Sequence, residues 1–146
     1  MAILVIVFLL LSDIITKQWA LRYLAVEGDI TVIEGFFKLS YLENRGAAFG
    51  ILQNKQIFLI IITSIIILGM LYYVFILKPK SRLLNWSLYL IIAGAVGNLI
   101  DRNFLGFVVD FLEFHYKSYY FPTFNLADTF VVIGTGPLII YVLKGE

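Results

Sequence analysis

The chain has 146 residues, of which 61% are hydrophobic and 14% charged, and its mean hydropathy is +0.93. A soluble domain is about 45–50% apolar and about 25% charged, so the composition predicts an integral membrane protein. A formal net charge of +1 excludes the basic surface that nucleic-acid binding requires. With no cysteine and a single histidine, the sequence excludes disulfides and Cys-based or His-rich metal sites.

Four apolar segments are predicted to cross the membrane as helices, because each approaches the roughly 20 residues that a bilayer requires. The clearest is 57–77, which contains no charge. The first crosses only if it continues past Asp13 and Lys17, which are four residues apart and therefore face each other on a helix. The third contains small residues at 93–95 and 97 that allow close helix packing. The predicted spans are about 2–24, 57–77, 83–102 and 125–143.

The connecting segments carry weaker signals. Residues 25–56 contain DITVI and FFKLSYL, two strand-like runs separated by Glu34-Gly35, so a small β element is expected there. Residues 103–124 are rich in aromatic side chains, which prefer the headgroup layer, so an interfacial loop is expected. Loop 78–82 holds three bases and no acid, which indicates cytoplasm, but the two sides hold four and seven bases in total. The charge count therefore leaves the orientation open.

Acidic residues at membrane depth are costly and indicate function. With four spans, the same side of the membrane receives Asp13, Asp101, Asp110 and Asp128. Apolar neighbours in FVVDFLEF are expected to raise the pKa of Asp110, which we place in a loop. Two carboxyls in a partly apolar cleft share one proton, as in aspartic proteases. The alternative is that these acids only pair with nearby bases, namely Lys17, Arg22 and Arg102.

Helical spacing predicts which polar residues meet. Asn125 and Asp128 are three residues apart and lie on one face of the fourth span. Asn98 is three and four residues from Asp101 and Arg102, so it faces both. Arg102 is then expected to be a partner for a buried carboxylate.

Five strings extend across nearly the whole chain in a familiar order: D-I-I-T-K (13–17), N-R-G-A-A-F (44–49), G-A-V-G-N-L-I-D-R (94–102), V-V-D-F (108–111) and F-N-L-A-D (124–128). Together they resemble the motif set of the signal peptidase II family, the lipoprotein signal peptidases. Each string alone is weak evidence for this family, but five strings in the family's order and spacing are specific to it.

The resemblance implies an all-α integral membrane protein that acts as an aspartyl endopeptidase. It would cleave bacterial prolipoproteins on the amino-terminal side of a diacylglyceryl-modified cysteine, at the outer face of the cytoplasmic membrane. Both termini and loop 78–82 would be cytoplasmic, and 25–56 and 103–124 extracytoplasmic. The implied catalytic pair is Asp110 and Asp128. The polar shell around substrate and pair would comprise Asp13, Asn44, Gly46, Asn98, Asp101, Arg102 and Asn125.

Further expectations follow from this assignment. The enzyme should act as a monomer with membrane lipids and its lipid-modified substrate as partners, without cofactor, metal or nucleic acid. Segments 44–52 and 106–124 are expected to close over the site, with Gly46-Ala47-Ala48 allowing close substrate approach. Three rival interpretations stay open: a small channel or proton-coupled carrier using the same carboxylates, a structural or chaperone-like subunit, and a metallopeptidase with Asp and Glu ligands.

Overall fold

The computed structural model describes residues 1–46 and 52–145, and within them four helices are long and apolar enough to cross a membrane. The first joins α1 (Ala2–Trp19), a π-helical turn (Ala20–Leu24) and α2 (Ala25–Glu27), and the second joins α3 (Gln56–Tyr72) and a π-helical turn (Tyr73–Leu77). The third and fourth are α4 (Arg82–Phe104) and α5 (Leu126–Lys144). The predicted four-helix architecture is confirmed.

The first helix runs through its two charges without a break. Asp13 and Lys17 are exposed by only 0% and 2%, and the Lys17 Nζ lies 2.8 Å from the Asp13 Oδ2. Each charge thus offsets the cost of burying the other, as the spacing of four residues predicted. This pairing lets the helix continue as far as Glu27.

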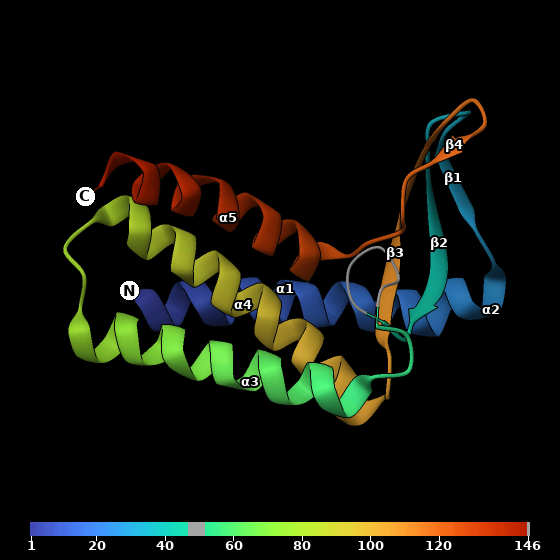
Figure 1. Ribbon diagram of the computed structural model, residues 1–146. Coiled ribbons are helices and arrows are strands. Elements are labelled where there is room, and N and C mark those ends of the chain that lie inside the picture. Colours follow the sequence, from blue (N-terminus) through green and yellow to red (C-terminus); the bar gives the residue numbers. More distant parts are fainter. Residues whose placement is uncertain (47–51, 146) are drawn as a thin grey trace.

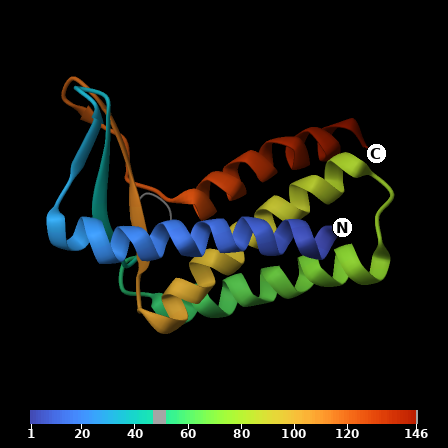
Figure 2. The ribbon, with the colours of Figure 1, turned by 180° about the vertical axis from the view of Figure 1, so that it is seen from behind.

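Helix α4 is the centre of the bundle, since it packs against α1, α3 and α5. Glycine permits the closest of these contacts: a Cβ at Gly94 would overlap the carbonyl oxygen of Ala127 on α5. The expected close packing of the small residues is therefore present. Both termini and the connection 78–81 lie at one end of the bundle, and the β strands lie at the other (Figures 1 and 2).

A four-stranded antiparallel sheet stands at that second end. Its order is β1 (Ile30–Ile33), β2 (Phe37–Asn44), β3 (Val108–Tyr116) and β4 (Tyr119–Tyr120). The hairpin of β1 and β2 confirms the expected β element, and Gly35 supplies the positive φ of +69° in its turn.

The sheet corrects two expectations. The structure is predominantly helical and not purely all-α, and much of 103–124 is strand instead of loop. Strand β3 pairs with β2 along its length, so Asp110 lies opposite Leu42 in the sheet and not in a loop. Its pairing partner is distant in sequence, which is why local sequence patterns did not reveal the strand.

Apolar packing fixes β3 to the helices. Val109 and Phe111 are exposed by 1% and 4% and pack with Ala20 and Leu24 of the first helix. Elsewhere the helices expose large apolar side chains, such as Ile65 on α3 and Val132 on α5. Such apolar surfaces are stable in contact with lipid chains. The buried packing of β3 against the first helix places Asp110 beside the helix ends.

Candidate active site

The first turn of α5 carries a reciprocal capping box. The Asp128 amide donates to the Asn125 Oδ1 at 2.9 Å, and the Asn125 amide donates to the Asp128 Oδ2 at 3.3 Å. The predicted proximity of the two residues is confirmed, and each side chain contacts the backbone amide of the other residue. The positive end of the helix dipole lies beside this carboxyl group.

Asp110 projects from β3 toward the same place and is 1% exposed. Its Oδ2 accepts from the Asn44 Nδ2 at 3.0 Å, and its Oδ1 accepts from the Asn125 Nδ2 at 2.7 Å. Burial, followed by the nearby charge of Asp128, raises the pKa of Asp110 from 3.8 to about 7. The predicted dehydration of this carboxyl is confirmed, so it can hold a proton near neutral pH.

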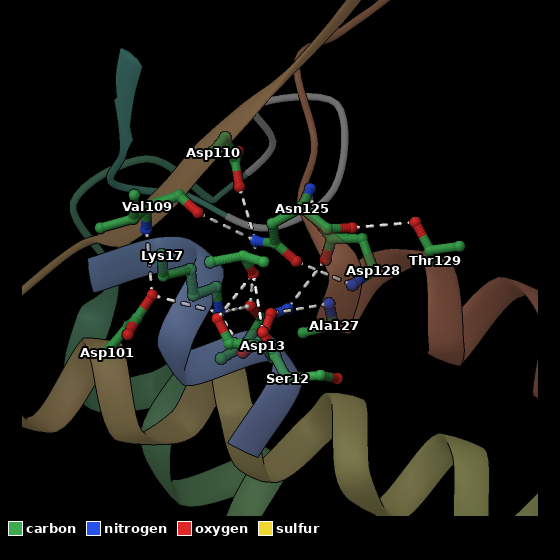
Figure 3. A network of polar contacts seen from close by, with 12 residues as sticks. Ser12, Asp13, Lys17, Asp101, Val109, Asp110, Asn125, Ala127, Asp128 and Thr129 are labelled. Carbon is green, nitrogen blue, oxygen red and sulfur yellow. Dashed lines mark hydrogen bonds and ion pairs between the residues drawn. The ribbon is translucent and has the colours of Figure 1, made fainter. Parts of the chain in front are cut away.

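Asparagine side chains connect the two acids. Asn125 lies between Asp110 and Asp128, as Figure 3 shows. Asn98, on α4, donates from its Nδ2 to the Asp128 Oδ1 at 2.8 Å. The Asn98 Oδ1 in turn accepts from the Lys17 Nζ at 2.9 Å. Both acids are therefore held by amide donors and linked to each other through Asn125.

The other two acids hold the scaffold together through Lys17. Its ammonium lies 2.8 Å from the Asp13 Oδ2 and 3.2 Å from the Asp101 Oδ2. Asp13 also accepts from the Ala127 amide at 2.9 Å, and Asp101 accepts from the Val109 amide at 3.1 Å. Asp13 thus ties α1 to α5, and Asp101 ties α4 to β3. The contacts of Asp13 and Asp101 thus match the alternative stated above, in which an acid pairs with a nearby base, here Lys17.

Gly97 makes room for this network. A Cβ at this position would overlap the Asp13 Oδ2. Only glycine allows the Asp13 carboxylate to lie against the backbone of α4 while its Oδ1 reaches Ala127 on α5.

The expected pairing of Arg102 with a carboxylate is wrong for the described residues. Its guanidinium donates to the Gly46 carbonyl oxygen at 3.1 Å, and it forms no ion pair with an acid within 1–46 and 52–145. The reason is that β2 ends beside the last turn of α4, so a backbone oxygen lies within reach. Gly46 itself donates to the Asn44 Oδ1 at 3.0 Å. Ala47 and Ala48 lie outside the described residues, and the expected closure of this segment stays a prediction.

The structure therefore brings all four acids into one network, together with the predicted Asn44, Asn98 and Asn125. Lys17 was not predicted as a site residue, although its spacing from Asp13 already signalled a buried pair. The backbone amides of Val109 and Ala127 were also missed, and no sequence signal identifies such donors. No cluster of three or more His, Cys, Asp and Glu side chains arranged for a metal occurs within 1–46 and 52–145.

This arrangement suits one reaction class. Asp110, whose pKa is raised to about 7, lies close to a second acid, Asp128, which accepts a hydrogen bond from Asn98, and aspartic proteases use two neighbouring acids to activate water for attack on a peptide carbonyl.

Known proteins are similar to this chain over nearly its whole length. The sequence model of the family described as signal peptidase (SPase) II matches residues 5–144. A lipoprotein signal peptidase of Clostridium tetani (strain Massachusetts / E88) is 54% identical over 100% of this chain and 94% of its own, and one of Clostridium novyi (strain NT) is 48% identical over 99% and 98%. A bacterial membrane enzyme solved by the in meso method at 2.3 Å superposes with a TM-score of 0.89 at 36% identity, covering 98% of this chain and 87% of that one. These matches extend over the helices and the strands that carry the network, and the chain belongs to the signal peptidase II family.

Proposed function

We propose that Asp110 and Asp128 are the catalytic pair with which this membrane aspartic peptidase removes the signal peptide from diacylglyceryl-modified prolipoproteins. Membership of the signal peptidase II family gives the activity, and the relatives at 54% and 48% identity are named lipoprotein signal peptidases. The observation that carries the residue assignment is the pair itself: two acids on β3 and α5, linked by Asn125. A channel or carrier receives no support from these relatives.

The chemistry follows from the different surroundings of the two acids. Asp128, at the positive end of α5 with donors on both oxygens, acts as the base that takes a proton from the attacking water. Asp110, whose pKa is about 7, donates its proton to the oxygen of the scissile carbonyl as negative charge develops there. Asp128 then gives the proton that it took from water to the nitrogen of the cysteine, and Asp110 takes a proton back from a hydroxyl of the tetrahedral intermediate. The C–N bond breaks, the amine leaves, and the pair is restored.

The remaining polar residues orient the pair and the substrate. Asn44, Asn98 and Asn125 hold the carboxyl groups by hydrogen bonds. Asp13 and Asp101 fix the elements that carry them, through the Ala127 and Val109 amides. Arg102 and Gly46 join α4 to the end of β2, beside which the substrate backbone would lie. All of these residues come from one chain, so we propose a monomeric enzyme.

The site is proposed to face the outer side of the bacterial cytoplasmic membrane. The sheet lies at the end of the bundle opposite both termini and residues 78–81 (Figure 1), and the polar network joins β3 of this sheet to the ends of α4 and α5. Several bases on the sheet side are paired with acids, including Lys17, Lys38 and Arg45. Loop 78–82 has three bases and no acid, which supports a cytoplasmic position for it and for both termini.

Substrate access from the lipid fits this placement. A diacylglyceryl-modified cysteine stays anchored in the bilayer, which holds the scissile bond at headgroup depth. The pair lies where the first turn of α5 meets β3, at one end of the four apolar helices. The lipid anchor therefore delivers the substrate in the membrane plane.

The decisive experiment measures cleavage of a diacylglyceryl-modified precursor by the purified chain in detergent, followed by gel shift. We expect Asp110→Asn and Asp128→Asn each to abolish cleavage while the protein still folds. Asp29→Asn is the matched control, because Asp29 is an exposed acid whose contact is with Lys38. Substantial turnover by either variant of the pair would refute the assignment, and loss of activity in strong chelator would instead favour a metallopeptidase.

A further inference from the structure

Lys17 has a third contact that its ion pairs do not explain. Its Nζ, on a side chain exposed by 2%, lies 2.8 Å from Asp13, 3.2 Å from Asp101 and 2.9 Å from the Asn98 Oδ1. An ammonium group has three N–H donors and no acceptor. The ammonium thus forms ion pairs with two carboxylates and donates to Asn98, and because it has no acceptor the group that faces it from Asn98 must be an oxygen.

This constraint decides what Asn98 presents on its other side. With the oxygen turned to Lys17, the Nδ2 points to the Asp128 Oδ1 at 2.8 Å. If the amide turned by 180°, its oxygen would face a carboxylate oxygen, and its nitrogen would face an ammonium. The Asn98 Oδ1 also accepts from the Asn125 Nδ2 at 3.2 Å, so Lys17 and Asn125 both favour this orientation. Lys17 supplies the shorter of the two bonds and, as a group with no acceptor, excludes the reversed amide.

The other two asparagines of the network obtain the same polarity from backbone groups. The Asn44 Oδ1 accepts from the Gly46 amide at 3.0 Å, and the Asn125 Oδ1 accepts from the Asp128 amide at 2.9 Å. Each then turns its Nδ2 to Asp110. Within the described network, the oxygen of Asn98 is instead held by side chains, the Lys17 ammonium at 2.9 Å and the Asn125 amide at 3.2 Å.

We propose that Lys17 is a positioning residue for the cleavage reaction: it fixes the polarity of the Asn98 amide, which holds Asp128 in its reactive position. This inference rests on the proposed pair of Asp110 and Asp128. It differs from a role limited to joining α1 and α4, because such a role would act through Asp13 and Asp101 and would not depend on Asn98.

A double-mutant cycle separates the two roles. The kcat for cleavage of a diacylglyceryl-modified precursor is measured for Lys17→Met, Asn98→Ala and the double variant. Each single change should lower kcat by about 10- to 100-fold, the range for one hydrogen bond to a charged group. The double variant should lose little more than either single variant, since both remove the same donor to Asp128. Losses that multiply would overturn the proposal.

Lys38→Met is the matched control. Lys38 also bridges two acids, with its Nζ 2.9 Å from Asp29 and 3.2 Å from Glu113, but it is 26% exposed and lies outside the network. Its removal should change kcat by less than about twofold, as expected for surface ion pairs. A loss as large as that of Lys17→Met would show that losing a bridging lysine is enough, and would overturn the proposal.

If Lys17→Met does not fold, Asn98 still provides a test. Asn98→Asp keeps the shape and pairs with Lys17, but it turns an acceptor toward Asp128. We therefore expect a lower kcat for Asn98→Asp than for Asn98→Ala, with both proteins folded. The reverse order would mean that shape matters and polarity does not, which overturns the proposal. Turnover by Asp128→Asn would instead refute the proposed function itself, so the two failures are distinguishable.

Discussion

Replacing Asp110 by asparagine should stabilise the protein while abolishing cleavage, because the native carboxyl is held where its ionisation is unfavourable. Burial and the charge of Asp128 raise its pKa from 3.8 to about 7. At ~1.36 kcal/mol per pH unit, this difference corresponds to about 4 kcal/mol. The substituted amide avoids that cost, although its NH2 group would face one of the donors, Asn44 or Asn125, at a cost of about 1–3 kcal/mol.

The pH dependence isolates the ionisation from the lost hydrogen bond. A raised pKa stabilises the fold fully below 3.8, and this contribution disappears as pH rises through about 7. The advantage of Asp110→Asn over the parent should therefore grow by about 3 kcal/mol between pH 5 and pH 8 and then stay constant. The donor contact in the variant does not titrate, so it shifts the whole curve without changing its shape.

Unfolding of both proteins in detergent across this pH range provides the assay, with cleavage of the lipid-modified precursor measured in parallel. Asp29→Asn is the control with the opposite sign, because the hydrogen bond from Lys38 lowers the pKa of Asp29. That variant should show no gain with rising pH. A stability difference between Asp110→Asn and the parent that is the same at pH 5 and pH 8 would refute the reasoning.

Three further outcomes are expected. Cleavage by the parent should decline as pH rises through about 7, because Asp110 then loses the proton that it donates, and a rate that still rises from pH 7 to 9 would contradict this. Gly97→Ala should lower the free energy of unfolding by about 1–3 kcal/mol, because the added Cβ would overlap the Asp13 carboxylate. Gly69→Ala is the control and should leave the free energy of unfolding unchanged, because a Cβ there meets nothing within 4 Å. Equal free energies of unfolding for the two variants in detergent would count against the close contact at Gly97. A precursor without the diacylglyceryl group should be cleaved far more slowly than the modified one in the same gel-shift assay, and equal rates would remove the argument for access from the lipid.

Local sequence was sufficient for the features that depend on helix geometry and composition. The spacing of Asp13 and Lys17 predicted their ion pair, and the spacing of Asn125 and Asp128 predicted that the two residues lie together, as they do in the capping box. The apolar neighbours of Asp110 predicted its raised pKa. In each case the residues responsible lie within a few positions along the chain, so their geometry follows from helical periodicity or from hydrophobic surroundings.

Tertiary structure alone decided how these local units combine. Asp110 lies on a strand because β3 pairs with β2, and its partner Asn44 is 66 residues away. Arg102 contacts a backbone oxygen of Gly46 instead of an acid, across 56 residues. Lys17 reaches Asn98 across 81 residues and so becomes part of the site. Such contacts depend on which helix faces pack together and on where β2 ends, and no periodicity within one segment contains that information.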